Sequence, residues 1–331
     1  MSDTIRVGMI GCGGIAHGHV QRLQALPEAE IVALCDTSEA SIKRIQTAFT
    51  ATKALPVYAD YREMLEKEKL DAVQIASPHT LHFPQIMDSL DAGLHVLTEK
   101  PMVCSVAHAR QVIAKAEEAG KILCISYQRH FQGAFRYMRE AFQKGDIGEL
   151  VFMSALQGQR WLQGTAGTWR QDPALSGGGQ LNDSGSHLLD IILWVAGQGV
   201  SEVFAFVDNR GAAVDINSAI SVRFVNGAQG TFSVVGDSRC SWWEDITFWA
   251  QDATFFYRNG RLYEQLGDQA PVEVTKLPDY SDPDRNFIYG ILGKEPIQVP
   301  ATCGLRVIEL TEAAWRSAEC GAPVKVERTA E

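Results

Sequence analysis

One stretch near the start of the chain decides its fold: Ile5-Arg6-Val7-Gly8-Met9-Ile10-Gly11-Cys12-Gly13-Gly14-Ile15-Ala16. It begins as an apolar run typical of a buried strand and ends in the spacing G-x-G-x-x-A, and the residues after it have helical periodicity. This order is typical of a dinucleotide-binding turn. Gly11 would make the tight turn, Gly13 would let the backbone approach a pyrophosphate, and the small Ala16 would let helix and strand pack closely.

A carboxylate follows this turn at the distance that the motif requires. The apolar run 31–35 ends at Asp36, where a carboxylate accepts hydrogen bonds from the ribose of an adenosine. The start of the helix supplies N–H donors and positive dipole to phosphates. We therefore predict that the turn and this carboxylate bind a dinucleotide cofactor, through Gly11, Gly13, Gly14, Ile15, Ala16 and Asp36.

Asp36 also predicts which nicotinamide cofactor is used. Its carboxylate can accept from both ribose hydroxyls of NAD, whereas the 2′-phosphate of NADP would bring negative charge against it. The residues 37–39 supply no cation, although Lys43 and Arg44 follow one to two helical turns later. We expect NAD to be preferred over NADP, and these two cations can make the preference incomplete.

Length and composition limit the possible classes of protein. A chain of 331 residues predicts about two domains. The net charge of −10 argues against nucleic acid or an anionic membrane surface as a partner, and no apolar run is long enough to span a membrane. The seven cysteines are odd in number and form no C-x-x-C pair, which suits a reducing compartment. With no signal-type N-terminal segment, we expect a cytoplasmic protein, and we predict no metal ligands.

The pattern of strands and helices changes near residue 127. Before it, apolar strand-like runs alternate with helical stretches, which predicts a parallel sheet and an α/β Rossmann domain over residues 1–126. After it, runs of period two are joined by turns such as Asn226-Gly227 and Asn259-Gly260, and helices are sparse (135–144, 186–195 and 302–320). We predict an α+β domain over residues 127–331 with an open, mainly antiparallel sheet.

Two loops follow predicted parallel strands, at the sheet edge where ligands gather. One is Ser77-Pro78-His79-Thr80-Leu81-His82 and the other is Glu99-Lys100-Pro101. Each also fits an ordinary loop, with hydrogen-bonded histidines in the first and a surface ion pair before a helix in the second. Their position at the carboxyl end of the strands favours a role in ligand binding.

A third run, in the second domain, carries stronger chemistry: Ser176-Gly177-Gly178-Gly179-Gln180-Leu181-Asn182-Asp183-Ser184-Gly185-Ser186-His187. The three glycines permit a backbone bend or close approach to a ligand. Asp183 is placed to cap a helix, and His187 falls in the first turn of that helix. The positive helix end favours a neutral imidazole, which can accept a proton. The alternative is that Asp183 only caps the helix and His187 only packs.

Taken together, these residues give the chain a family resemblance that runs nearly from end to end. It resembles the Gfo/Idh/MocA oxidoreductases, the family of glucose–fructose oxidoreductase and inositol dehydrogenase. The N-terminal markers are the glycine turn, Asp36, Pro78 with His82, and Glu99-Lys100-Pro101. The second domain contributes Trp169-Arg170-Gln171-Asp172-Pro173, the run 177–187 and the segment 304–318. One departure is His79, where the family usually has asparagine.

The resemblance implies hydride transfer between a nicotinamide cofactor and a sugar, cyclitol or sugar derivative. Lys100 would hydrogen-bond the reacting hydroxyl, His187 would take its proton, and Asp183 would orient both; these three would be the catalytic residues. Further cofactor contacts would come from Ser77, Pro78, His79, His82, Glu99, Lys100 and Gln128. Substrate contacts would come from Lys100, Arg129, Trp169, Arg170, Asp183 and His187, with Trp161 as another aromatic that could line the sugar site or simply pack in the core.

Two other functions found in the family stay open, a cofactor-binding regulator without catalysis and a glycosidase that retains its NAD. The presence of Lys100, Asp183 and His187 together argues against the regulator. We also expect the sheet of the second domain to bury an apolar face carrying Trp242, Trp243, Phe248 and Trp249 in a homodimer or homotetramer.

Overall fold

The computed structural model describes residues 4–328 and divides into two compact units. The first unit comprises residues up to 103, then 107–127 and 281–304. The second comprises 104–106, 128–280 and the chain from 305 onward. Sequence predicts a single division near residue 127, and the structure differs because the segment 281–304 returns to the first unit.

The first unit is built on a parallel sheet with the strand order β3-β2-β1-β4-β5-β6. Regular alternation of strands and helices produces it, as the sequence predicts, so the expected Rossmann architecture is confirmed. The strands are β1 (Ile5–Ile10), β2 (Ala29–Cys35), β3 (Val57–Tyr58), β4 (Ala72–Ile75), β5 (His95–Thr98) and β6 (Leu123–Ile125). The helices between them are α1 (Ala16–Gln24), α2 (Glu39–Ala48), α3 (Tyr61–Lys67), α4 (His82–Asp91) and α5 (Val106–Ala119).

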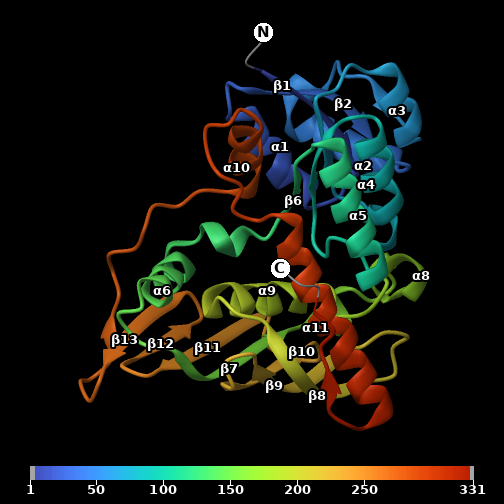
Figure 1. Ribbon diagram of the computed structural model, residues 1–331. Coiled ribbons are helices and arrows are strands. Elements are labelled where there is room, and N and C mark those ends of the chain that lie inside the picture. Colours follow the sequence, from blue (N-terminus) through green and yellow to red (C-terminus); the bar gives the residue numbers. More distant parts are fainter. Residues whose placement is uncertain (1–3, 329–331) are drawn as a thin grey trace. The chain divides into compact units, whose positions relative to one another are not determined.

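A helix from late in the chain completes this unit. Figure 1 shows α10 (Pro283–Ile291), in orange-red, beside the blue α1. Its Phe287 and Ile288 are buried in the same apolar cluster as Val7 of β1 and Val20 of α1. Burial of these side chains is the physical reason why the segment 281–304 belongs to the first unit.

The second unit is built on a mixed sheet with the order β14-β13-β12-β11-β7-β10-β9-β8-β15. β7 and β10 pair in parallel and every other pair is antiparallel, so the predicted open, mainly antiparallel sheet is confirmed. The strands are β7 (Leu150–Gln159), β8 (Val200–Asp208), β9 (Asn217–Phe224), β10 (Gln229–Val235), β11 (Trp242–Ala250), β12 (Ala253–Arg258), β13 (Arg261–Leu266), β14 (Val272–Glu273) and β15 (Val324–Lys325).

Helices cover one face of this sheet (Figure 1). α6 (Gly133–Lys144) packs against α9 (Gly185–Ala196), and α9 contacts β7. The long α11 (Ala301–Cys320) joins β8, where Ser317 Oγ accepts a hydrogen bond from the Ala205 N–H at 3.1 Å. Two short helices, α7 (Trp161–Gly164) and α8 (Pro173–Ser176), lie in the loop that precedes the glycine-rich run.

Strand β11 shows which of its aromatic side chains face away from the helices. Side chains alternate along a strand, so Trp242 and Phe248 share one face while Trp243 and Trp249 share the other. Phe248 is buried against Phe142 of α6, and the Arg129 guanidinium lies over the Trp242 ring. The prediction that all four form one exposed face is therefore wrong for Phe248, which is buried, whereas Trp242 is 40% exposed although alternation places it on the other face from Trp243.

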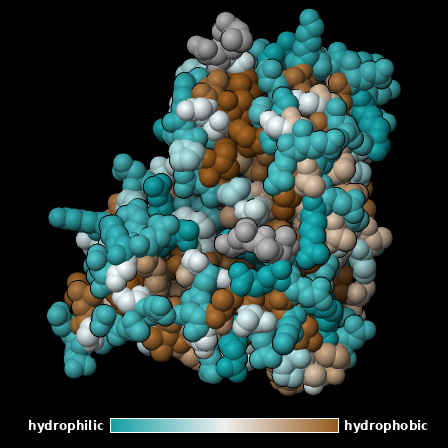
Figure 2. All heavy atoms as spheres, viewed as in Figure 1, coloured by the Kyte–Doolittle hydropathy of each residue, from teal (hydrophilic) through white to brown (hydrophobic). Residues whose placement is uncertain are grey.

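The surface has the polarity expected from the composition. Hydrophilic residues predominate on the face drawn in Figure 2, with smaller apolar areas between them. Among the helices of residues 4–328, none combines the length and the apolar character needed to cross a membrane.

Candidate active site

The glycine turn after β1 has the geometry of a dinucleotide-binding loop. Gly11 adopts a φ of 92°, and a Cβ at this position would lie 2.6 Å from the carbonyl carbon of Ala76, so only glycine fits. A Cβ on Gly13 or Gly14 would meet no atom within 4 Å, which leaves the outer side of the turn open to a ligand. The buried Ala16 begins α1 directly behind it. The residues present thus fit a dinucleotide.

Asp36 is held in place by backbone donors. Its Oδ2 accepts from the Cys12 N–H at 2.7 Å, and its Oδ1 accepts from the Ser38 N–H at 2.7 Å. Each carboxylate oxygen can accept a further hydrogen bond, because each has two lone pairs. The turn and the carboxylate at the end of β2 are therefore fixed to one another.

The loop after β4 is fixed from inside by His82. Its Nδ1 lies 2.8 Å from the carbonyl oxygen of Pro101, and its Nε2 lies 3.0 Å from that of Ser77. Burial lowers the pKa of His82, so the ring is neutral at pH 7 and donates to one of the two oxygens at a time. His82 and its ring neighbour His79 are both buried. His82 thus joins two predicted cofactor loops to each other, and Ser77 and Pro78 form the outer part of the first.

The second predicted loop follows β5. The Lys100–Pro101 peptide bond is cis, and Lys100 is partly exposed at this edge of the sheet. Glu99 is buried, and its Oε2 accepts from the Lys100 N–H at 3.3 Å. The ordinary alternative of an exposed Glu-Lys ion pair is therefore excluded for Glu99.

Glu99 has a partner that the sequence did not reveal. Its Oε1 lies 3.0 Å from Nε2 of His19, a completely buried residue of α1. The other ring nitrogen, Nδ1, lies 2.8 Å from Oδ1 of Asp284 on α10. Arg22 Nε in turn donates to Asp284 Oδ2 at 2.5 Å. These four residues form a chain of charges inside the first unit.

In the second unit, a buried carboxylate shapes the glycine-rich run. Asp215 accepts from the N–H groups of Gly179 and Leu181 with one carboxylate oxygen each, both at 2.8 Å. A Cβ on Gly179 would lie 1.9 Å from the Asp215 carbonyl oxygen, so the approach of these two backbones requires glycine. Gly178 packs against the ring of Trp315 in the same way. Gly177 ends α8 with a φ of 64°, so the three glycines serve the bend and its packing.

Asp183 does not cap the helix that follows it. α9 begins at Gly185, and its N-cap Ser184 makes no side-chain capping bond. The buried Asp183 carboxylate instead accepts from Trp161 Nε1 at 2.8 Å and from Arg170 Nε at 3.1 Å, both through Oδ2. The predicted cap is therefore wrong. Sequence alone shows an aspartate before a helix, and it does not show that Trp161 and Arg170 donate to its carboxylate.

His187 lies in the first turn of α9, as predicted, and is partly exposed. The start of this helix is tied to the sheet, because Ser184 Oγ accepts from the side-chain amides of Gln157 at 3.0 Å and Gln159 at 2.8 Å. Asp183, just before α9, and His187, in its first turn, therefore lie on one segment that is braced at Ser184; residues 183–187 are called the braced loop below.

Of the remaining residues predicted to contact cofactor or substrate, some are exposed and others are buried. Gln128 is exposed, whereas Arg129 is buried and its Nη1 lies 2.5 Å from Oε1 of Glu244. Trp169 and Arg170 are partly exposed, with the guanidinium 4.5 Å from the centre of the indole. Trp161 is buried, which matches the core alternative, yet its N–H reaches Asp183.

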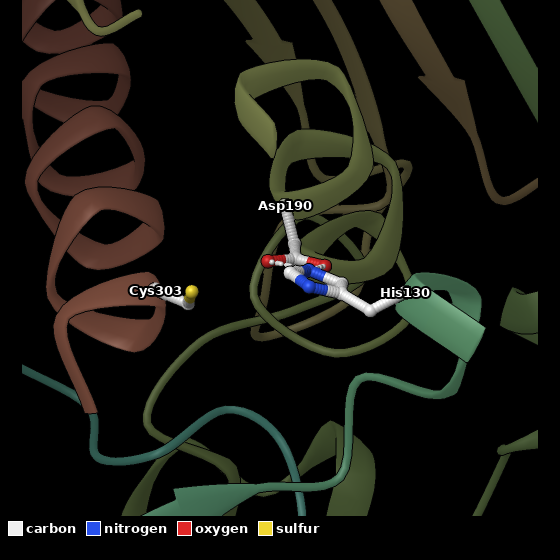
Figure 3. A group of neighbouring side chains, drawn as sticks. All are labelled: His130, Asp190 and Cys303. Atoms are coloured by element: carbon white, nitrogen blue, oxygen red, sulfur yellow. Dashed lines mark hydrogen bonds and ion pairs between the residues drawn. The ribbon is translucent and has the colours of Figure 1, made fainter. Parts of the chain in front are cut away.

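A buried histidine contacts a buried aspartate of α9. In Figure 3, His130 and Asp190 point toward each other, and His130 Nε2 lies 2.8 Å from Asp190 Oδ2. Burial raises the pKa of Asp190, and the charge and hydrogen bond of His130 oppose that rise. The pair fixes α9 against the segment Gln128–Phe131.

A dinucleotide turn on a parallel sheet, in a chain whose other unit presents an aspartate and a histidine from one braced loop, defines a two-unit dinucleotide-dependent oxidoreductase. Two family models match the chain. Residues 5–127 match the oxidoreductase family with an NAD-binding Rossmann fold, and residues 135–255 match the GFO/IDH/MocA C-terminal domain. The chain belongs to the GFO/IDH/MocA oxidoreductase family, as its sequence predicts.

Relatives are similar over nearly the whole chain. Myo-inositol 2-dehydrogenase of Thermotoga maritima is 28% identical and covers 98% of this chain and 99% of its own length. D-glucoside 3-dehydrogenase of Escherichia coli is 29% identical, with 98% of each chain covered. Among solved structures, aldose-aldose oxidoreductase of Caulobacter crescentus shares the fold with a TM-score of 0.86 at 23% identity, covering 97% of this chain and 99% of that one.

Proposed function

We propose that this protein transfers a hydride between NAD and a secondary alcohol of a sugar or cyclitol. The observation that carries the proposal is the braced loop that presents Asp183 and His187, in a chain whose other unit has an open dinucleotide turn. The names of the relatives, an inositol dehydrogenase and a glucoside dehydrogenase, support the substrate class.

In the proposed mechanism, bound NAD supplies the acceptor for the hydride that leaves the carbinol carbon. His187 takes the hydroxyl proton, so proton and hydride leave the substrate separately and a carbonyl forms. The ammonium group of Lys100 hydrogen-bonds the same oxygen and favours the developing alkoxide. Asp183, held by Trp161 and Arg170, orients the substrate and the imidazole.

The supporting residues have different roles in this proposal. Glu99 is buried and fixes the backbone of Lys100, whereas Ser77, Pro78 and the exposed Gln128 contact the cofactor. His79 and His82 are buried and shape the loop after β4, whose outer residues contact the cofactor in this proposal. Trp169 and Arg170 contact the substrate. Arg129, which is held by Glu244, is a further substrate contact in this proposal.

The same proposal includes a preference for NAD over NADP. The Asp36 carboxylate would face a 2′-phosphate directly, because two backbone N–H groups fix its direction. Of the two cations on α2, Arg44 is hydrogen-bonded to Ser41 Oγ at 3.0 Å, which favours keeping it on its own helix. Arg44 would then not offset the repulsion between the Asp36 carboxylate and the 2′-phosphate of NADP.

We further propose that the uncovered face of the second sheet is a contact between subunits of a homodimer or homotetramer. Trp243, Trp249, Phe152 and Leu156 lie on this face, and Phe206 is 68% exposed there. Apolar area of this kind is costly in water and is typical of interfaces. Light scattering at micromolar concentration tests this, and a mass of one chain would contradict it.

We also propose a reducing compartment, the cytoplasm, for this protein. Each of the seven cysteines is a free thiol. Burial raises the pKa of Cys12 and of Cys35 to about 12, and the charge of Asp36 adds to both shifts, so these thiols stay protonated and unreactive at pH 7. Thiol titration of freshly isolated protein should find them reduced.

The decisive experiment is a substrate screen with purified protein and NAD. Sugars, cyclitols, sugar acids and sugar phosphates are each offered, and NADH formation and sugar release are both recorded. Net NADH formation with a polyol supports the proposal. Sugar release from a glycoside without net NADH would replace it with a cofactor-retaining glycosidase, and cofactor binding without any turnover would replace it with a regulator.

A further inference from the structure

A completely buried histidine lies at the centre of the first unit and belongs to none of the predicted motifs. The His19 side chain, on α1, contacts two other segments: the loop after β5 through Glu99, and α10 through Asp284. Its Nε2 lies 3.0 Å from Glu99 Oε1, and its Nδ1 lies 2.8 Å from Asp284 Oδ1. The three side chains therefore connect three segments that are far apart along the chain.

The contacts of His19 favour a particular charge. Each ring nitrogen lies next to a carboxylate oxygen, and only the imidazolium can donate to both. Arg22 Nη2 also lies 3.2 Å from Nδ1, so this nitrogen faces a cation as well as a carboxylate. Burial by itself lowers the pKa of His19. The charge of Asp284 and the hydrogen bonds with Asp284 and Glu99 outweigh burial and raise this pKa to about 9.

Glu99 responds to the same contact. Burial raises its pKa, but the hydrogen bond and the charge of His19 outweigh burial, with a smaller effect from Lys100, and the pKa falls to about 2. The other charged groups that face this chain are Arg22, bonded to Asp284 Oδ2, and Asp282, 3.7 Å from the Arg22 Nε. At pH 7 the buried carboxylates of Glu99 and Asp284 are thus matched by two cations.

The second carboxylate oxygen of Glu99 connects His19 to the loop that carries Lys100. Glu99 Oε1 is occupied by His19, while Oε2 accepts from the backbone N–H of Lys100 at 3.3 Å. A rotation of the Glu99 carboxylate would break both contacts together, and a hydrogen bond with the Ser126 side chain also holds this carboxylate. We propose that His19 is a positioning residue, an internal cation that fixes the Glu99 carboxylate and through it the backbone of Lys100. In its kinetic part, this inference rests on the function proposed above.

Three variants separate positioning from packing. His19→Gln removes the cation and one of the two donors. Asp284→Asn keeps the shape of the chain but removes the charge that does most to raise the pKa of His19. His95→Gln is the matched control, because this partly buried histidine begins β5 at the strand end opposite to Glu99.

Nitrogen NMR of the apo protein with labelled histidines tests the charge without any turnover. One imidazole signal, absent from His19→Gln, should titrate near pH 9. In Asp284→Asn the same signal should titrate at lower pH. A His19 ring that is neutral at pH 7 would overturn the proposal, whether or not the substrate screen succeeds.

Unfolding by urea gives a second measure of the same charge. Because the folded pKa is raised above the ordinary value of 6.5, His19 contributes stability that is complete below about pH 6.5 and is lost as pH rises through about 9. This pH-dependent loss should be absent from His19→Gln. If His19→Gln does not fold, wild-type protein and Asp284→Asn still decide the matter, since the loss must move to lower pH in Asp284→Asn.

Kinetics with a substrate from the screen test the consequence for Lys100. We expect His19→Gln to lower kcat roughly 10- to 100-fold with little change in the KM of the alcohol, because a misplaced group loses transition-state contact more than substrate binding. Wild-type kcat should also fall near pH 9, and this fall should move to lower pH in Asp284→Asn. An equal loss of kcat in His95→Gln, or an unmoved alkaline limb, would show that His19 only packs.

Discussion

The two units of this protein hold their reactive loops by different means. In the first, side chains from distant segments meet as ions, Glu99 with His19 and His19 with Asp284. In the second, one carboxylate, Asp215, gathers two backbone N–H groups of the loop it supports. The first arrangement depends on the charge of His19, while the second depends on the close approach of two backbones and on the absence of a Cβ at Gly179. The two loops should therefore fail under different perturbations.

The largest effects should come from the reacting groups that the two loops carry. Lys100→Met and His187→Ala should each lower kcat at least about 100-fold, the usual scale for removing an acid–base or charge-stabilising group. Steady-state kinetics measure this, and titration of NAD into each variant separates the units. His187→Ala should leave NAD affinity unchanged, because the dinucleotide turn and His187 belong to different units. Near wild-type turnover of either variant would refute its assigned role.

A change of shape in the second unit should have the next largest effect. In Gly179→Ala the new Cβ would lie 1.9 Å from the Asp215 carbonyl oxygen, so backbone must move. We expect the free energy of unfolding of this variant to fall by about 1–3 kcal/mol, the scale of overpacking. Gly164→Ala is the control, since its Cβ would meet no atom within 4 Å. Equal free energies of unfolding of the two variants in urea would show that the backbone at residue 179 can shift to accept a Cβ, which would contradict the need for glycine there.

The smallest effect concerns cofactor choice in the first unit. We expect kcat/KM for NAD to exceed that for NADP by at least about tenfold, which corresponds to ~1.4 kcal/mol. Asp36→Ser should narrow the ratio, because it removes the charge that meets the 2′-phosphate. Comparable efficiency with both cofactors in the unmutated protein would contradict this interpretation of Asp36.

Local patterns in the sequence predict much of the first unit. The turn at Gly11, the acid at Asp36 and the loop at Glu99 each sit beside a strand whose apolar run is visible by itself. His19 could not be found in this way, because Asp284, its partner, is 265 positions later in the chain. The only local signal was a histidine on the buried face of α1, three residues after Ala16.

The second unit was less predictable because its loop is supported by residues with no local signature. The run 177–187 stands out in the sequence as a candidate site, yet its glycines serve Asp215 and Trp315, and Asp183 is bonded by Trp161 and Arg170. An acid between Val214 and Ile216 was the available sign of a buried carboxylate. Helix α10 was missed as well, and its Asp282 cap before Pro283 is the signal that could have shown it.

The return of α10 to the first unit has a consequence for biosynthesis. Chains grow from the N-terminus, and domains generally fold as they emerge. The segment up to residue 127 can form its sheet early, but His19 and Glu99 have to wait for Asp284, which is made after the whole of the second sheet except β15. The nascent dinucleotide-binding unit therefore holds His19 without the carboxylate that does most to raise its pKa until translation is nearly complete. A fragment cut at residue 127 would stay in that unfinished state, and attempts to isolate the Rossmann unit should retain residues 281–304.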